Sequence, residues 1–176
     1  MSDPTKLTRA DIARLLELLA AELASEGAEG EIYLVGGAVM CLVFDARSAT
    51  RDVDAYFRPT RTIRLAAARV AAKEGVPETW LNDAVKGFLS PRGEFDPYLE
   101  LPSLRVFTAR PEYLLAMKCV SMRLGEEFRD LDDVRYLLRY LNISNAEMAL
   151  EIVARYFDDD VIAPKTRLAL EELLPG

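Results

Sequence analysis

Two aspartates separated by one residue, Asp52 and Asp54, are the strongest candidates for chemistry in this chain. They lie in the segment Arg-Asp-Val-Asp-Ala-Tyr-Phe, whose apolar and aromatic residues favour a strand. Residues two apart in an extended chain point to the same side, so both carboxylates would project from one face about 6.6 Å apart. Asp is depleted in strands, and like charges on one face repel each other. The pair therefore predicts a site for a hard cation such as Mg²⁺, which prefers oxygen ligands.

Two other Asp-x-Asp pairs serve as a comparison within the same sequence. Asp130 and Asp132 lie in a helical pattern, where residues two apart diverge. Asp158 to Asp160 form an acidic run of the kind that is usually solvated. Only the pair at 52 and 54 has the spacing expected of two ligands.

A glycine pair upstream of the aspartates adds a feature that suits phosphate. Ile32 to Val35 form an apolar run of strand length, and Gly36-Gly37 interrupts it before Ala38 to Phe44, which is typical of a short helix. Such a turn leaves backbone N–H groups unpaired at a helix N-terminus, and it lacks the Cβ atoms that would prevent close approach. We expect a phosphate-binding bend beside the cation site.

In this order the motifs resemble the active-site signature of the DNA polymerase β nucleotidyltransferase superfamily, in the compact branch that includes the AbiEii-like toxins of bacterial toxin–antitoxin systems. The resemblance extends from about Ile32 to Leu138. The segments that carry it are Gly36-Gly37, Thr50-Arg51-Asp52-Val53-Asp54, Leu115-Ala-Met-Lys118, Arg123 and Arg129-Asp130-Leu-Asp-Asp133.

The resemblance implies a Mg²⁺-dependent transferase that moves a nucleoside monophosphate from an NTP to a hydroxyl group. The acceptor would be a tRNA end or a protein, the outcome would be growth inhibition, and a cognate antitoxin would be a partner. Asp52 and Asp54 would hold the metal, and Gly36 and Gly37 would present backbone donors to phosphate. The alternative is a catalytically inactive nucleotide-binding or partner-binding module of the same fold.

Lys118 and Asp130 are the later residues that the resemblance singles out. Lys118 has no acidic partner within its own predicted helix, so it either extends to water or points into a cleft. The matching motif favours the cleft, where its charge would neutralise a triphosphate. Asp130 would orient the substrate or that lysine. The alternatives are a helix N-terminal charge and a salt bridge to Arg123 or Arg129.

Members of this superfamily commonly add a third carboxylate from a later strand, and Glu100 is the candidate here. It alternates with Leu99 and Leu101 in a predicted strand, and the alternative is an exposed strand glutamate. Trp80, the only tryptophan, stands beside polar residues including Asn82. A tryptophan there stacks a base or caps a cleft, although a place in the core is the commoner use.

The arginines near the aspartates form a second candidate for phosphate binding. The chain carries a net charge of −7, which argues against a large nucleic-acid footprint. A local cluster nevertheless surrounds the proposed site, consisting of Arg47, Arg51, Arg58, Arg61 and Arg64. Such a patch would hold an NTP or an RNA end, with Arg51 as a phosphate ligand. A solvated mixture of charges is the alternative.

Composition excludes several classes of site. The 176 residues contain no histidine, which rules out a His-based triad, a His-ligated zinc site and an imidazole base. Cys41 and Cys119 lie in apolar helical stretches, which predicts core residues in a reducing compartment. The sequence shows no apolar run of about 18 residues and no signal pattern, so we expect a cytoplasmic protein without a membrane partner.

The predicted elements indicate an α/β (α+β) protein. Residues 1–109 are expected to form a nucleotidyltransferase-like core, a mixed sheet flanked by helices, including an amphipathic helix from Thr8 to about Ser25. From Pro111 onward every predicted element is a helix. Residues 110–176 are therefore expected to form an all-helical C-terminal lobe packed on that core.

Overall fold

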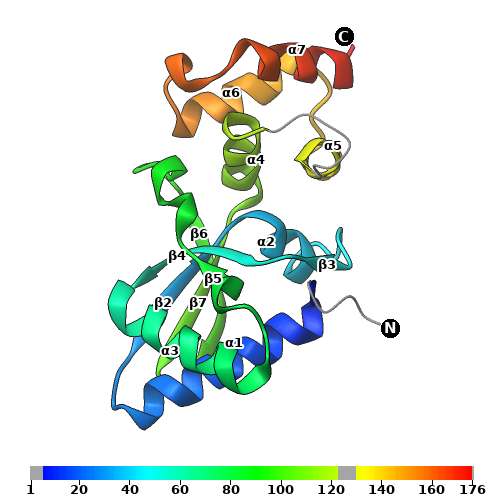
Figure 1. The fold of residues 1–176 in the computed structure, drawn as a ribbon. Helices are drawn as coiled ribbons and strands as arrows, with labels where there is room; N and C mark the ends of the chain where they lie inside the picture. Colours follow the sequence, from blue (N-terminus) through cyan, green and yellow to red (C-terminus); the bar gives the residue numbers. More distant parts are fainter. Residues whose placement is uncertain (1–5, 123–129, 176) are drawn as a thin grey trace. The chain divides into compact units, whose positions relative to one another are not determined.

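A computed structural model describes residues 6–122 and 130–175 (Figure 1). Within these ranges the chain is mixed α/β, with seven α-helices, a five-stranded mixed sheet and a separate two-stranded sheet. The α/β class expected from the sequence is confirmed. Arg123 and Arg129, two residues of the motifs named above, lie outside the described residues.

The chain divides into two compact units. The first consists of Met1–Gly87 and Phe95–Ala109, and we call it the sheet unit. The second consists of Phe88–Glu94 and Arg110–Gly176, and we call it the helical unit. Asp52 and Asp54 belong to the sheet unit, and Lys118 belongs to the helical unit.

The sheet unit is built around a sheet with the strand order β5-β4-β2-β7-β6. Its strands are β2 (Gly30–Leu34), β4 (Val53–Arg58), β5 (Leu81–Asn82), β6 (Phe95–Leu101) and β7 (Leu104–Ala109). The central strand, β2, is antiparallel to β4 and parallel to β7. β5 joins β4 in parallel, and β6 joins β7 antiparallel. Two short strands, β1 (Leu7–Thr8) and β3 (Ala49–Thr50), form the separate antiparallel pair.

One face of this sheet is apolar and buried, because the strands alternate as half-buried strands should. The inward residues include Ile32, Leu34, Ala55, Phe57 and Val106. Helices α1 (Arg9–Ser25) and α3 (Thr60–Glu74) pack against each other and against β7 and β4 respectively (Figure 1). Thr8 is the N-cap of α1, since its hydroxyl accepts a hydrogen bond from the Asp11 N–H at 3.2 Å.

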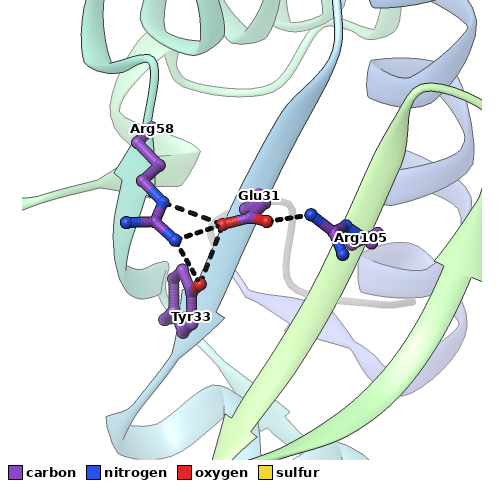
Figure 2. A network of polar contacts seen from close by, with 4 residues as sticks. All are labelled: Glu31, Tyr33, Arg58 and Arg105. Carbon is purple, nitrogen blue, oxygen red and sulfur yellow. Dashed lines mark hydrogen bonds and ion pairs between the residues drawn. The ribbon is translucent and has the colours of Figure 1, made fainter.

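The opposite face carries a polar and aromatic network at the end of the sheet where β2 begins (Figure 2). We call it the Glu31 network, consisting of Glu31, Tyr33, Arg58 and Arg105. The Arg58 Nε donates to the Glu31 carboxylate at 2.8 Å, and Arg105 reaches the other carboxylate oxygen from β7. The Tyr33 hydroxyl donates to Glu31 at 2.8 Å, and its ring stacks on Phe107 with centroids 4.8 Å apart. The network ties three adjacent strands together.

Replacement of Glu31 by Gln is expected to lower the free energy of unfolding by about 1 kcal/mol, because both arginines lose their charged partner while remaining largely in solvent. Hydrogen bonds from Tyr33 and then Arg58 lower the pKa of Glu31 below its ordinary 4.5. This contribution is therefore present above pH 4.5 and is lost as pH falls through the lowered pKa. Urea denaturation of both proteins at pH 7 and pH 3 measures it.

The matched control for that measurement is Glu29→Gln, at an exposed glutamate that lines the same surface groove as Glu31, Arg58 and Arg105. It should change the unfolding free energy by less than about 0.5 kcal/mol. A Glu31→Gln deficit that is the same at pH 3 as at pH 7 would contradict the electrostatic explanation.

The helical unit consists of α4 (Pro111–Val120), α5 (Asp130–Tyr140), α6 (Ala146–Tyr156) and α7 (Pro164–Leu173). α4 packs against α5 and α6, and α6 packs against α7. Leu114, Leu115, Val134, Leu137 and Val153 are among the residues of its core. Cys119 and Cys41 are both buried and are not joined in a disulfide, and burial raises the pKa of Cys119 to about 12. The prediction that both cysteines are core residues is confirmed.

The segment 88–94 is bound into the helical unit by tyrosines of α4 and α6. The Tyr113 hydroxyl accepts a hydrogen bond from the Ser90 N–H at 2.9 Å, and the Tyr156 hydroxyl donates to Glu94 at 2.7 Å. A Cβ atom on Gly93 would lie 2.5 Å from the Tyr113 ring, so only glycine fits there. Burial and the Glu94 carboxylate raise the pKa of Tyr156, which keeps this hydroxyl protonated as a donor.

β6 begins at Phe95, and its edge position and an irregular register tolerate Pro97. The side chain of Asn145 caps α6, accepting from the Met148 N–H at 2.9 Å. The helix after the glycine pair was expected to begin at Ala38, but it includes both glycines.

Candidate functional site

The glycine pair and β4 come together at the end of the sheet opposite the Glu31 network. α2 (Gly36–Leu42) begins directly after β2, and the Val35 N–H donates to the Asp54 carbonyl at 3.0 Å. Gly36 has a φ of 66°, which favours glycine, and a Cβ atom there would lie 3.2 Å from Asp54 Oδ2. The Asp54 carboxylate therefore lies against the first turn of α2.

Gly37 brings two further polar side chains to the same place. A Cβ atom on Gly37 would lie 2.7 Å from Arg47 Nη1 and 2.8 Å from Thr50 Oγ1. The guanidinium of Arg47 and the hydroxyl of Thr50 thus occupy the space that a larger residue would need. The sequence indicated Arg47 only as one of five arginines near the aspartates, and it gave no reason to single out the Thr50 hydroxyl.

The predicted basic cluster is divided by the fold. Arg47 lies against Gly37, and Arg51 is an exposed residue in the bend before β4. Arg58 belongs to the Glu31 network at the other end of the sheet, and Arg64 pairs with Asp83 at 2.8 Å. Of these four arginines, only Arg47 and Arg51 are positioned near the glycine pair and the two aspartates.

Asp52 lies just outside the strand that was expected to contain it. β4 begins at Val53, and Asp52 occupies a bend between β3 and β4. The regular alternation that was assumed for the pair therefore applies only to Asp54, which is a correction. The side chain of Asp52 is oriented by a neighbouring strand, because Asn82 Nδ2 donates to Asp52 Oδ2 at 3.1 Å. The Thr50 hydroxyl also donates to the Asp52 carbonyl, at 3.2 Å.

Glu100 is not positioned to join the two aspartates, and its prediction as a third metal ligand was wrong. The strand register places Glu100 level with Arg105 and therefore with the Glu31 network. On β4 that level is Arg58, four residues beyond Asp54, which corresponds to about 13 Å along a strand. Glu100 is an exposed residue that lines the groove at that end. The exposed strand glutamate, the alternative, is the correct interpretation.

Among the residues of β6, Asp96 lies at about the same level of the sheet as Asp54. Its side chain, however, belongs to the opposite face of the sheet. It pairs with Thr108, Thr108 pairs with Leu34, and Leu34 pairs with Ala55, next to Asp54. Paired residues of neighbouring strands share a face of the sheet. Asp96 thus shares the face that α1 and α3 cover, whereas Asp54 points to the opposite face.

In the helical unit, Lys118 forms a buried ion cluster with two aspartates of the next helix. Its ammonium lies 3.3 Å from Asp130 Oδ1 and 2.8 Å from Asp133 Oδ2. The three residues are 8%, 3% and 2% exposed, respectively. Lys118 lacks an acidic partner on its own helix, as the sequence indicated, but α5 supplies two. One ammonium therefore faces two carboxylates, with Asp130 in a position to orient Lys118.

Trp80 belongs to the core of the sheet unit, which confirms the commoner of the two uses considered for it. Its side chain is 1% exposed, and its indole N–H donates to the Ala67 carbonyl at 3.0 Å. The polar residue that does reach the site from this stretch is Asn82, which sequence reasoning mentioned only as a neighbour of the tryptophan. Asn82 is the last residue of the short strand β5, a position that the sequence did not indicate.

The oxygen donors around Asp54 suit Mg²⁺ in number and type. Asp52 and Asp54 offer hard carboxylate oxygens, and Mg²⁺ is usually held by one or two carboxylates together with substrate phosphates. Among the residues that the structure describes, no group of three or more His, Cys, Asp or Glu side chains forms a metal cage. The donor set therefore fits a metal that the protein shares with a phosphate ligand.

Comparison with protein-family models, with curated proteins and with solved structures finds no match to this chain. Within residues 6–122 and 130–175, no helix combines the length and the apolar character needed to cross a membrane.

Proposed function

We propose that this chain is a nucleotidyltransferase that uses Mg²⁺ to move a nucleoside monophosphate from an NTP to a hydroxyl acceptor. Its sheet unit would be a nucleotidyltransferase-like core. The observation that carries the proposal is the position of the Asp54 carboxylate, with a Cβ on Gly36 lying only 3.2 Å from its Oδ2. Two motifs that are separate in the sequence, one suited to a cation and one to phosphate, meet at this point.

The reaction breaks one phosphorus–oxygen bond and forms another. The acceptor oxygen bonds to the α-phosphorus, the bond from that phosphorus to the bridging oxygen of the β-phosphate breaks, and pyrophosphate leaves with that electron pair. The hydroxyl proton passes to solvent or to a carboxylate of the site. Asp52 and Asp54 would hold Mg²⁺, which when bound neutralises phosphate charge and makes the acceptor hydroxyl more acidic. The protein mainly positions the reactants.

Phosphate binding in this proposal rests on the first turn of α2 and on nearby arginines. Gly36 and Gly37 leave room there for the side chains of Asp54, Arg47 and Thr50 and would present backbone donors to phosphate, while Arg47 and Arg51 bring positive charge to the same end of the sheet. A triphosphate-binding role for Lys118 is carried by the family resemblance alone. Within the helical unit, Asp130 is in a position to orient Lys118.

The acceptor class follows from charge and from the family resemblance. A tRNA end or a protein hydroxyl is the proposed acceptor, and a small contact is preferred because the net charge of −7 repels long nucleic acids. We also propose a toxin role with a cognate antitoxin as partner. The two buried thiols, which are not joined in a disulfide, suit a reducing compartment, so we place the reaction in the cytoplasm.

The test is transfer of label from NTPs. Purified protein is incubated with Mg²⁺ and each of the four α-³²P-labelled NTPs, with total RNA or with a cell lysate as acceptor. We expect one or more NTPs to label a discrete RNA or protein band, and EDTA to abolish the labelling. Absence of label on every acceptor would refute the transferase.

The second candidate is a nucleotide-binding or partner-binding module of the same fold without turnover. It is favoured by one observation, namely that neither Glu100 nor Asp96 reaches the face and level of Asp54. Calorimetric titration separates the two candidates. Mg²⁺-dependent NTP binding without product supports the nucleotide-binding module, and absence of NTP binding refutes both the transferase and the nucleotide-binding module.

A further inference from the structure

The segment from Trp80 to Lys86 has no part in the reaction proposed above, yet it is fixed to the sheet unit on both sides of Asn82. On one side, the Trp80 indole is buried and donates to the Ala67 carbonyl of α3. On the other side, Asp83 pairs with Arg64 of α3 at 2.8 Å and with Lys86 at 2.6 Å. The hydrogen bond from Lys86 lowers the pKa of Asp83, which keeps this carboxylate charged.

The side-chain amide of Asn82 can adopt only one orientation between its two partners. Its Nδ2 donates to the Asp52 carboxylate at 3.1 Å, and its Oδ1 accepts from the Ala84 N–H at 3.3 Å. A carboxylate only accepts and a backbone N–H only donates, so a flipped amide would lose both bonds. Asn82 therefore presents a donor of fixed direction to Asp52.

Asp52 lies outside the strand ladder, so strand pairing does not orient its side chain. The parallel ladder between β4 and β5 begins with the pair Val53 and Leu81 and continues with Asp54 and Asn82. Asp52 precedes that ladder, in a bend, whereas Asp54 is held within the ladder and by the Val35 N–H. The two proposed metal ligands thus differ in how their orientation is set.

We propose that Asn82 is a positioning residue that directs the Asp52 carboxylate toward the metal site. The anchored segment from Trp80 to Lys86 would hold Asn82 in place. This inference rests on the proposed transferase function, which it deepens. Asn82 itself touches neither metal nor substrate. Hydrogen-bond partners of metal-ligating side chains typically contribute about 10- to 100-fold to metal affinity or activity.

Two variants remove the donor. Asn82→Asp keeps the shape of the side chain and the oxygen that accepts from the Ala84 N–H, but it adds a negative charge beside Asp52, whereas Asn82→Ala removes the donor without adding charge. The proposal predicts that Mn²⁺ binds Asn82→Asp and Asn82→Ala about 10- to 100-fold more weakly than wild type. It further predicts a raised metal concentration for half-maximal transfer, with kcat at saturating metal within about threefold of wild type.

Each protein is mixed with Mn²⁺ and an α,β-methylene analogue of whichever NTP the wild-type protein uses in transfer. Electron paramagnetic resonance then measures the concentration of free Mn²⁺. Transfer rates are then measured against Mn²⁺ concentration. The matched control is Asn145→Asp, the same chemical change at the N-cap of α6, where Asn and Asp cap equally well. It should bind Mn²⁺ as wild type does. Circular dichroism and thermal unfolding without metal establish that each variant is folded.

The outcomes are distinguishable. Wild-type protein that neither transfers nucleotide nor binds Mn²⁺ overturns the proposed function and this inference together. Wild-type protein that does both, with folded Asn82→Asp and Asn82→Ala variants binding Mn²⁺ equally well, overturns this inference alone. Weakened Mn²⁺ binding that excess Mn²⁺ compensates in the transfer assay supports it, because a purely structural defect would not respond to metal.

Discussion

We expect Asp54→Asn to lower the proposed nucleotide transfer by about a thousandfold, equivalent to about 4 kcal/mol in the transition state, while the chain stays folded. The amide has the shape of the carboxylate, but it carries no charge to oppose a divalent cation and offers one oxygen where Asp54 offers two. Asp54 is held within β4, so this change alters the site without altering the ladder. Initial rates of label transfer from α-³²P NTP at saturating Mg²⁺ measure the loss.

Asp45→Asn is the matched control for that experiment. Asp45 is an exposed residue between α2 and β3 with a φ of 52°, a conformation that asparagine adopts readily. The substitution removes the same charge from the same unit, and transfer should remain within about twofold of wild type. Equal activity of Asp54→Asn and Asp45→Asn would remove Asp54 from the metal site and with it the main support for the transferase.

We expect Lys118→Met to lower the free energy of unfolding by about 3–5 kcal/mol, which is the general cost of removing one partner from a buried ion pair. The methionine fills a similar volume, so the effect comes from charge. Asp130 and Asp133 are each no more than 3% exposed, and both lose the ammonium that lies within 3.3 Å. Equilibrium denaturation in urea, followed by circular dichroism, measures the change.

The control for Lys118 is Lys165→Met in the first turn of α7, an exposed lysine in the same unit. Its effect should be below about 0.5 kcal/mol. A Lys118→Met protein as stable as wild type would show that the cluster contributes nothing to the fold. If such a protein had also lost NTP binding, the role of Lys118 would be to bind phosphate and not to stabilise the fold.

Much of the local structure was predictable because it depends on neighbours in the sequence. The apolar spacing of α1, the cap at Thr8 and the strand before the glycine pair follow from periodicities of 3.6 and 2 and from short-range hydrogen bonds. The same local reasoning failed where a tertiary context took over. Pro97 is tolerated because β6 became an edge strand, and edge position cannot be inferred from the residue itself.

The sequence by itself determined the two motifs of the candidate site, because glycines that permit close approach and carboxylates two residues apart can be recognised from residue type and spacing. Only the tertiary structure decided which side chains share that site. Glu100 and Asn82 illustrate the difference. Strand order and register placed Glu100 level with Arg105, away from the two aspartates, and placed the Asn82 amide nitrogen 3.1 Å from the Asp52 carboxylate. The fold likewise gave Lys118 two carboxylate partners from another helix. Side-chain neighbourhoods across strands and helices depend on long-range pairing, which no local pattern encodes.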